Sequence, residues 1–519
     1  MSPNPRRRVS LMSLSLCASL LAGCGALPSL EGRSLSSALP LGEAKETRLG
    51  RAITPLTQSN PGISGIYPLA SPRDAFAARA LLAQAAQQTL DVQYYIWRGD
   101  TTGTLLLQAL LEAADRGVRV RLLLDDNGTS GIDPQIAALD SHPKVEVRLF
   151  NPFPSRSAKW LGFLTDFSRA NRRMHNKSFT ADNMASIVGG RNIGDEYFAA
   201  TDGVLFADLD VLSVGPVVRQ VSDDFDRYWG SGSAYPVNRL MPAASVSERA
   251  EVAATANRLR QSPKATEYVA ALKKLQFINQ LLHGQLELIW ANTRMVSDDP
   301  AKGLGKVAPE QLLTYQVGAI IARPNSHVEL VSPYFVPTPA GVEAFSEMSR
   351  RGVKVRILTN ALESTDVVAV HAGYAKARKD LLQAGIELYE MRRQSAVSDK
   401  ADKHKVFGSS GSSLHAKTFA VDGQRVFVGS FNFDPRSAKL NTELGFVIDS
   451  PLLAKRIELA FDQDLPLSAY RVMLAENGDL KWVEQSASGH ISYDTEPGSS
   501  IWVRMAVGFL SLLPIDWML

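Results

Sequence analysis

The sequence contains almost no cysteine, which limits how the fold can be stabilised. Only Cys17 and Cys24 occur in 519 residues. The three arginines at 6–8 and the apolar run that follows them, to about Leu21, are typical of a secretory signal that is removed on export. Cys17 would leave with that signal, so a mature exported chain would keep one thiol and could form no internal disulfide.

Long hydrophobic runs are also missing. The N-terminal run is too short and too soon interrupted to span a membrane. Residues 501–519 are strongly apolar, but this segment is short for a span and is broken at Pro514. It predicts either a helix docked on the folded domain or an interfacial foot on a membrane surface.

The chain has no large excess of positive charge. Its net charge is +3, and residues 1–23 hold three arginines and no acid, so their removal leaves a mature chain near zero. Binding to nucleic acid depends on neutralising phosphates, and we therefore expect no nucleic-acid partner. The histidines outside the repeated motif described below show no metal-ligand spacing, so we predict no metal site and no cofactor.

The segment Leu21-Ala22-Gly23-Cys24 looks like a bacterial lipobox, in which Cys24 becomes the diacylated first residue. This predicts a lipoprotein signal peptide over 1–23 and a tether over 24–64, which is rich in Ser, Gly and Pro. Two acyl chains suffice for stable attachment, so we expect a membrane-anchored lipoprotein in the bacterial cell envelope, facing the periplasm. An ordinary cleavage site beside an incidental cysteine is the alternative.

One short motif occurs twice in the chain. Its first copy consists of His175, Lys177, Asp182, Gly189 and Asn192. The second copy lies at a constant offset of 240 residues and consists of His415, Lys417, Asp422, Gly429 and Asn432. Chance does not produce that register, so the motif marks an internal repeat.

The second copy is predicted to form a β-hairpin. Residues 414–421 have the composition of a strand, Asp422-Gly423 favours a two-residue type I′ turn, and residues 426–428 form the return strand. His415 and Lys417 then share one face, and the hairpin brings the asparagine loop back beside them. An imidazole, a cation and an amide in one place suit an anionic ligand such as a phosphodiester.

The order of helices and strands repeats as well. We predict helix, strand, helix, strand at 74–88, 90–97, 104–116 and 118–124, and again at 309–323, 328–336, 340–351 and 353–358. This alternation indicates an α/β fold of two α/β/α domains, each with a central mixed β-sheet. We place the first domain at 65–236, a helical connector at 237–285, the second domain at 286–465 and a C-terminal extension at 466–519.

Two acids follow the motifs at equivalent positions. Beyond the asparagine loops the offset is 235, which pairs Asp208 with Glu443. Each acid either holds its loop in place or accepts the second N–H of its motif histidine, which would fix the tautomer of the ring. Asp182 and Asp422 belong to the motif, but they lie at hairpin turns and are interpreted as structural.

These residues resemble the phospholipase D superfamily, whose signature is His-x-Lys-(x4)-Asp followed by Gly-Ser/Gly-x-Asn in two copies. The stretches 90–97, 189–198 and 429–443 are similar to bacterial cardiolipin synthases of the C type, and the resemblance covers roughly 65 to 519. It implies two domains about a pseudo-twofold axis, with both motifs facing one cleft. It also implies phospholipid substrates: a phosphatidyl group would be transferred to phosphatidylglycerol, with phosphatidylethanolamine as the donor that the C type implies.

The resemblance implies a role for each motif residue. His175 would be the nucleophile that forms a phosphohistidine, and His415 the acid and base, although the symmetry of the repeat leaves that order open. Lys177, Lys417, Asn192 and Asn432 would donate to the phosphoryl oxygens, and Gly189 and Ser430 would complete the substrate-binding loops. A phospholipase D hydrolase, another phosphodiesterase or nuclease on this fold, and an inactive lipid-binding scaffold are the alternatives.

The segment before the first motif carries an aromatic stripe. Trp160, Phe163, Leu164 and Phe167 have the spacing of one helix face, and basic residues flank them. The segment predicts either a core-facing helix or a helix that lies on an anionic membrane beside the site.

Overall fold

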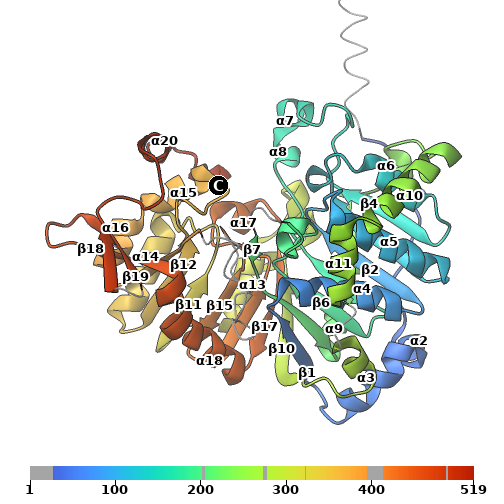
Figure 1. Ribbon diagram of the computed structural model, residues 1–519, viewed down its shortest axis with the longest axis horizontal. Helices are drawn as coiled ribbons and strands as arrows, with labels where there is room; N and C mark the ends of the chain where they lie inside the picture. The colour runs from blue at the N-terminus through green and yellow to red at the C-terminus, as the bar shows by residue number, and fades with distance from the viewer. Residues whose placement is uncertain (1–26, 202–204, 273–276, 322, 394–412, 487–488) are drawn as a thin grey trace, which may run out of the picture.

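The structure is a computed structural model that describes residues 27–519 except 202–204, 273–276, 322, 394–412 and 487–488. It consists of two α/β halves that lie side by side (Figure 1). The predicted signal peptide and Cys24 lie outside the described residues.

The first half contains a mixed sheet in the order β9-β4-β3-β2-β5-β6-β8-β1. The strands are β1 (Ser64–Leu69), β2 (Thr89–Tyr94), β3 (Arg119–Asp125), β4 (Val145–Phe150), β5 (Ser178–Ala181), β6 (Ala185–Gly189), β8 (Asp210–Val214) and β9 (Ala234–Pro236). Strands β2, β3 and β4 are parallel, because helices α5 (Thr101–Asp115) and α6 (Asp133–Asp140) cross over between them.

The second half repeats this arrangement in the order β10-β17-β16-β15-β11-β12-β13-β18-β19-β20. Its strands are β10 (Ile289–Ser297), β11 (His327–Val331), β12 (Lys354–Asn360), β13 (Glu387–Met391), β15 (Thr418–Val421), β16 (Arg425–Gly429), β17 (Leu444–Asp449), β18 (Ala469–Leu474), β19 (Leu480–Ser486) and β20 (Gly489–Tyr493). Helices α14 (Thr338–Arg350), α15 (Val368–Ala375) and α16 (Arg378–Gln383) provide the crossovers.

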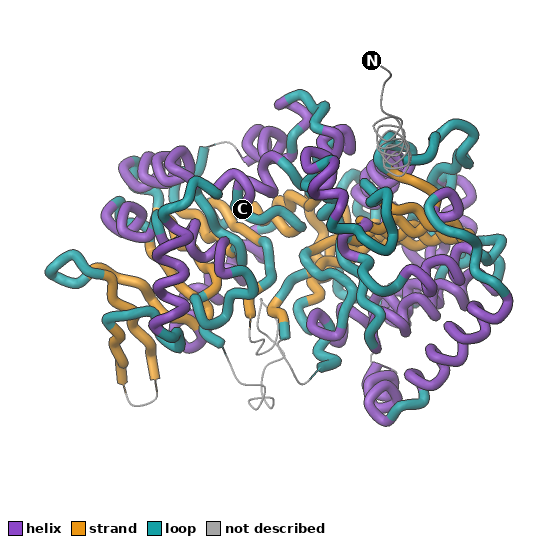
Figure 2. The backbone as a smooth tube through the Cα atoms, turned by 90° about the horizontal axis from the view of Figure 1, so that it is seen from above, coloured by secondary structure: helices purple, strands orange, loops and turns teal. Residues whose placement is uncertain are grey.

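The two sheets join into one. Strand β1 pairs with β10 antiparallel, with Gly65 opposite Trp290, and the strands named above therefore form a continuous sheet through both halves. Strands run through the middle of the molecule with helices outside them (Figure 2). A shared apolar cluster contains Val188 and Val211 of the first half and Val428 and Phe446 of the second, so the halves share a core.

Helices cover both halves of the sheet. In the first half α4 (Pro72–Ala85) begins at Ser71, whose side chain accepts a hydrogen bond from the Asp74 N–H, and it packs beside α5. The connector carries α10 (Val246–Arg260), α11 (Pro263–Leu272) and α12 (Phe277–Leu282), which lie against the first half (Figure 1). In the second half α13 (Leu313–Ile321) and α14 occupy the place of α4 and α5, and α18 (Pro451–Leu459) lies near β15 and β16.

The prediction of a tether over 24–64 is wrong for much of that segment. Helices α2 (Leu41–Glu46) and α3 (Arg48–Gln58) fold onto the first half, and Leu49 and Ile53 are buried in its core. Leu49, Ile53 and Leu56 do have helical spacing, but Gly50 and Pro55 in the same stretch made it resemble a linker.

Two other predicted elements are shorter than expected. The strand expected over 414–421 is interrupted, because β14 (Ser413–Leu414) pairs with β7 (Phe206–Ala207) and only β15 belongs to the large sheet. The helix expected over the aromatic stripe breaks at Asp166 (φ −148°) into α7 (Leu161–Thr165) and α8 (Phe167–Ala170).

The C-terminal segment is a helix docked on the folded domain, the first of its two alternatives, and its role on a membrane surface stays a prediction. Helix α20 (Ile501–Ser511) buries Val507 against Leu362 and Ala372, while the side chains of Trp502 and Phe509 are 74% and 64% exposed. Within the described ranges no helix is both long and apolar enough to cross a membrane.

Candidate active site

Each motif loop is held by the opposite half of the molecule. The backbone N–H of His175 donates to the Thr442 carbonyl at 2.9 Å, and the N–H of His415 donates to the Ala207 carbonyl at 2.7 Å. Thr442 and Ala207 are equivalent positions, since they differ by 235 residues. The two motifs therefore meet about an approximate twofold axis.

Each motif histidine contacts the acid that belongs to the other half of the molecule. His175 Nδ1 lies 2.9 Å from Glu443 Oε2, and His415 Nδ1 lies 2.6 Å from Asp208 Oδ2. The sequence paired each acid with the histidine of its own copy, which is wrong. The residues just before each acid cross the axis to pair with the other motif loop, and they carry the carboxylate with them.

The neighbours of the two acids explain a difference between the copies. Ser430 Oγ donates to Glu443, and Ser437 Oγ donates to the same carboxylate at 2.7 Å. In the first copy Gly190 replaces the serine, and a Cβ there would lie 2.2 Å from Asp208 Oδ1. The shorter acid thus occupies the space that the serine fills in the other copy.

Both motif lysines are buried beside the histidines. Lys177 Nζ donates to the His175 carbonyl at 2.5 Å, and Lys417 Nζ lies 3.0 Å from His415 Nε2. Burial lowers the pKa of Lys417 to about 8 and lowers the pKa of Lys177 well below its usual value. Burying two charged lysines away from water costs free energy unless negative charge lies beside them. This favours binding of a phosphate group in the site.

The same environment shifts the other titratable groups. Burial lowers the pKa of both imidazoles well below its usual value, and the charges of both lysines lower it further. Burial raises the pKa of Glu443 to about 7, although Lys177 acts in the opposite direction. Because each lysine acts on both histidines, the two motifs form one electrostatic unit.

Aromatic rings that were missed in the sequence surround the imidazoles. Tyr95 meets His175 edge-on with ring centroids 5.0 Å apart, and Tyr197 meets His415 at 5.1 Å. Phe206 also lies 5.1 Å from His415. Tyr95 follows strand β2 and Tyr197 follows the first asparagine loop, and their positions at strand or loop ends are the only signal that could have found them.

The two motif asparagines differ in their partners. Asn192 is occupied on both sides, because its Oδ1 accepts from the Ile96 N–H at 3.2 Å and its Nδ2 donates to the Tyr197 hydroxyl at 3.0 Å. The buried Oδ1 of Asn432 has no hydrogen-bond partner among the described residues. Gly189 ends β6, where a Cβ would lie 2.1 Å from Asp210 Oδ1, so this glycine permits a close approach of two strands.

The motif aspartates lie at the turns and hold the backbone. Asp182 accepts hydrogen bonds from the N–H groups of Gln87, Gln88 and Thr89, and Asp422 accepts from the equivalent residues 325–327. The turn residues Asp422 and Gly423 have φ of 54° and 63°, as a type I′ turn requires. In the described part of the chain, the hydrogen bonds of both aspartates go to these residues and not to a motif histidine, which agrees with the structural interpretation.

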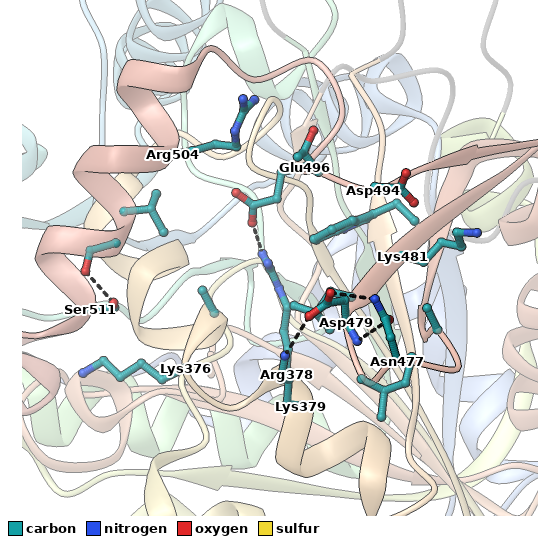
Figure 3. Close-up of a pocket in the computed structure, with 18 of the residues that line it drawn as sticks. Lys376, Arg378, Lys379, Asn477, Asp479, Lys481, Asp494, Glu496, Arg504 and Ser511 are labelled. Atoms are coloured by element: carbon teal, nitrogen blue, oxygen red, sulfur yellow. Dashed lines mark hydrogen bonds and ion pairs between the residues drawn. The ribbon is translucent and has the colours of Figure 1, made fainter.

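A large polar pocket lies elsewhere, between α16, the β18–β19 turn and α20 (Figure 3). Two ion pairs lie among the charges that line it: Arg378 contacts Glu496, and Lys379 lies 3.6 Å from Asp479. These pairs fasten the C-terminal extension to the second half. In the portion of the chain that is described, no cluster of three or more potential metal ligands occurs.

Comparisons with known proteins match both halves. A family described as "Cardiolipin synthase, PLD-like domain" matches residues 80–229 and 318–465. Cardiolipin synthase C of Escherichia coli (strain K12) is 50% identical over 474 residues, which cover 91% of this chain and 100% of that protein. An uncharacterized protein of Helicobacter pylori (strain ATCC 700392 / 26695) is 33% identical over 415 residues, or 79% of this chain and 81% of that one.

A solved structure supports the fold. Phosphatidylserine synthase from Haemophilus influenzae Rd KW20 matches with a TM-score of 0.54 at 12% identity, covering 91% of this chain and 100% of that chain. Fold and paired motifs thus define a protein of the phospholipase D superfamily. The chain belongs to the cardiolipin synthase family and is a phospholipid phosphatidyltransferase.

Proposed function

We propose that this protein transfers a phosphatidyl group to a hydroxyl of phosphatidylglycerol through a covalent phosphohistidine. The observation that carries the proposal is the exchanged pairing of both motif histidines with Glu443 and Asp208, beside two buried lysines. A displacement at phosphorus needs a nucleophile, an acid for the leaving oxygen and positive charge around the phosphoryl oxygens. The two motifs together supply one nucleophile, one acid and two cationic lysines, which is enough for a single displacement.

In the first step the Nε2 of His175 attacks phosphorus. Its Nδ1–H is held by Glu443, so the lone pair stands on Nε2, and the lowered pKa keeps the ring neutral at neutral pH. The P–N bond forms, the bond from phosphorus to the donor's head-group oxygen breaks, and His415 gives that oxygen a proton. Burial and the two lysines lower the pKa of His415 in the free site, so the imidazolium form that this step requires would depend on Asp208 and on the negative charge of the bound phosphate.

The second step reverses the first with a new alcohol. The acceptor hydroxyl attacks phosphorus, its proton passes to His415, and the P–N bond breaks to restore His175. Lys177 and Lys417 neutralise the non-bridging oxygens in both steps. The site is nearly symmetric, so the two histidines could exchange roles with equivalent contacts. Trapping the phosphohistidine and locating it on His175 or His415 would identify the nucleophile.

Support for a lipid alcohol as acceptor, rather than water, comes from the relative named cardiolipin synthase C. The donor is then a second phospholipid, and phosphatidylethanolamine is the specific hypothesis. A hydrolase would use the same residues with water in the second step.

The proposal includes attachment to a membrane in the bacterial envelope through lipidated Cys24. An exposed apolar face adds support: it consists of Trp160, Leu164 and Phe167 of the α7–α8 segment, Trp502 and Phe509 of α20, and Trp517 of η7 (Asp516–Met518). Phe167 and Trp517 meet with ring centroids 6.4 Å apart, which makes the two segments one surface. Apolar and aromatic side chains of this kind favour the interface of a bilayer.

The experiment is a product assay. Purified enzyme receives isotopically labelled phosphatidylglycerol with and without phosphatidylethanolamine, and the lipids are identified by mass. We expect labelled cardiolipin, with ethanolamine released when phosphatidylethanolamine is present. Phosphatidic acid as the sole product, at saturating phosphatidylglycerol, would show a hydrolase instead.

A further inference from the structure

An apolar groove of about 560 Å³ opens in the second half of the molecule. Leu330 and Phe419 form its floor on strands β11 and β15, and Val317 of α13 and Phe345 of α14 form its walls. Ligand pockets commonly have volumes of roughly 300–1,000 Å³ and a mostly apolar lining. The groove is therefore large enough for a ligand.

In the first half the equivalent strand residues, Val92 of β2 and Phe179 of β5, are fully buried, so the fold alone does not expose this part of the sheet. There α4 buries most of its side chains, including Arg79, which donates to the Tyr94 hydroxyl at 2.7 Å and to Asp210 at 2.8 Å. At the place of Asp210 the second half has Gly445, 235 residues later, beside the ring of Phe427. Of the described side chains of α13, only Leu313 is buried. An ion pair that fills one half is thus replaced by rings and an open groove in the other.

The groove adjoins the catalytic loop. Phe431 and Phe433 line it, and they flank the motif residue Asn432. Helix α17 (Pro435–Lys439) forms one end, and its Ser437 donates to Glu443, the partner of His175.

The same end of the groove lies near the exposed apolar face. The Arg436 N–H of α17 donates to the Leu519 carbonyl at 2.7 Å, directly after η7, whose Trp517 belongs to that face. A hydrocarbon chain of a ligand that runs from the phosphate site into the groove would therefore lie between the catalytic loop and this face.

We propose that the groove holds one fatty acyl chain of the phospholipid whose phosphate occupies the histidine site. This inference rests on the proposed function. It adds that the second half of the molecule selects the length of the fatty acyl chain. Among the residues that line the groove, charged side chains occur only at Asp434 and Lys439 on the catalytic side, so the remainder suits a hydrocarbon. Each methylene that moves from water into such a lining increases affinity about fourfold.

Two substitutions test the groove. A Cβ at Gly318 of α13 would meet no heavy atom within 4 Å, so Gly318→Leu fills groove space without a clash. Gly42→Leu on α2 is the matched control, because its Cβ also meets nothing within 4 Å and it lies in the first half. Both changes replace a helical glycine, Gly318 inside α13 and Gly42 in the first turn of α2, and neither should lower helix stability.

We expect Gly318→Leu to lower turnover of dipalmitoyl substrate about tenfold, while leaving dihexanoyl substrate within about twofold of wild type. Gly42→Leu should alter neither. An equal loss on both chain lengths, or no loss on either, would overturn the proposal.

A binding measurement separates the groove from the chemistry. The inactive double variant His175→Ala/His415→Ala is titrated with a fluorescent polyene fatty acid of eighteen carbons, with and without Gly318→Leu. We expect saturable binding that Gly318→Leu weakens about tenfold. If wild type makes no cardiolipin but this binding is seen, the proposed function fails while an acyl site remains. If binding is absent or is indifferent to Gly318→Leu, the groove proposal fails whatever the product assay gives.

Discussion

At each motif histidine, Nδ1 is held by a buried carboxylate, and at His415 the other ring nitrogen lies 3.0 Å from Lys417 Nζ. Glu443 and Asp208 hold Nδ1 from opposite halves, so neither half holds a complete histidine–acid pair by itself. Desolvation works against every charge in the site: it lowers the pKa of the imidazoles and lysines and raises that of the carboxyls. A phosphodiester supplies the negative charge that the lysines lack.

The lysines predict an alkaline limit of activity. Lys417 has a pKa of about 8, so its charge is present below that pH and is lost as the pH rises through it. We expect kcat/KM on a soluble phosphodiester to fall above about pH 8. In Lys417→Arg, which stays charged, any remaining activity should lose part of this decline. Lys455→Arg, an exposed position on α18, is the control, and a wild-type profile that stays flat well above pH 8 would refute the role of the lysine charge.

The motif aspartate predicts a loss of stability without a loss of chemistry. Asp182→Ala leaves the N–H groups of Gln87, Gln88 and Thr89 without their acceptor, and that of Thr89 is buried, which should cost about 3 kcal/mol in the free energy of unfolding. The activity of the folded fraction should stay within about threefold of wild type. Denaturant unfolding and activity are measured on the same sample. An inactive protein of unchanged stability would instead place Asp182 in the reaction.

At the scale of elements, the site is made by short segments that cross the axis. Strand β14 pairs with β7, and the isolated bridge between Met174 and Thr442 is its counterpart in the other copy. On the outer surface α7, α8 and α20 leave large apolar side chains uncovered, with Trp160 63% and Leu164 73% exposed. Phe163, of the same stripe, instead packs on Phe153 with ring centroids 5.3 Å apart.

This exposed face predicts a role on vesicles. Trp502→Ser with Phe509→Ser, or Trp160→Ser with Leu164→Ser, should weaken binding to phosphatidylglycerol vesicles at least about tenfold, since each large apolar side chain contributes about 1.5–3 kcal/mol when it leaves water. Thermal stability and turnover of a soluble phosphodiester should hardly change. Leu452→Ser on α18, at the opposite end of the molecule in Figure 1, is the control. A large drop in melting temperature would place these side chains in the core.

Much of the arrangement of motifs, helices and strands could be predicted from the sequence, and the predictions that were wrong have physical causes. The repeated offset located both motifs and the type I′ turns, because Asp-Gly and Asp-Asn tolerate positive φ. The offset could not reveal which histidine each acid serves, because the same spacing fits pairing within a copy or across the axis. Leu49, Ile53 and Leu56 have helical spacing, but the helices at 41–58 were missed because Gly50 and Pro55 inside α3 argue against a helix.

At the scale of the whole molecule, one sheet runs through both halves and one apolar cluster lies between them. The halves are equivalent around the histidines but differ beyond them. Arg79 and Asp210 fill the first, and the apolar groove opens in the second. A symmetric centre with asymmetric surroundings suits a reaction in which two similar lipids take different roles.

The central claim is that the two motifs form one active site, and single and double histidine variants test it most directly. His175→Ala, His415→Ala and the double variant are assayed for cardiolipin formation, with folding checked by thermal unfolding. If each histidine performs a different half of one displacement, each single variant should lose activity by a factor of about 10⁴ or more, and the double variant should be no worse than either. Additive losses, or substantial activity in either single variant, would contradict a shared site.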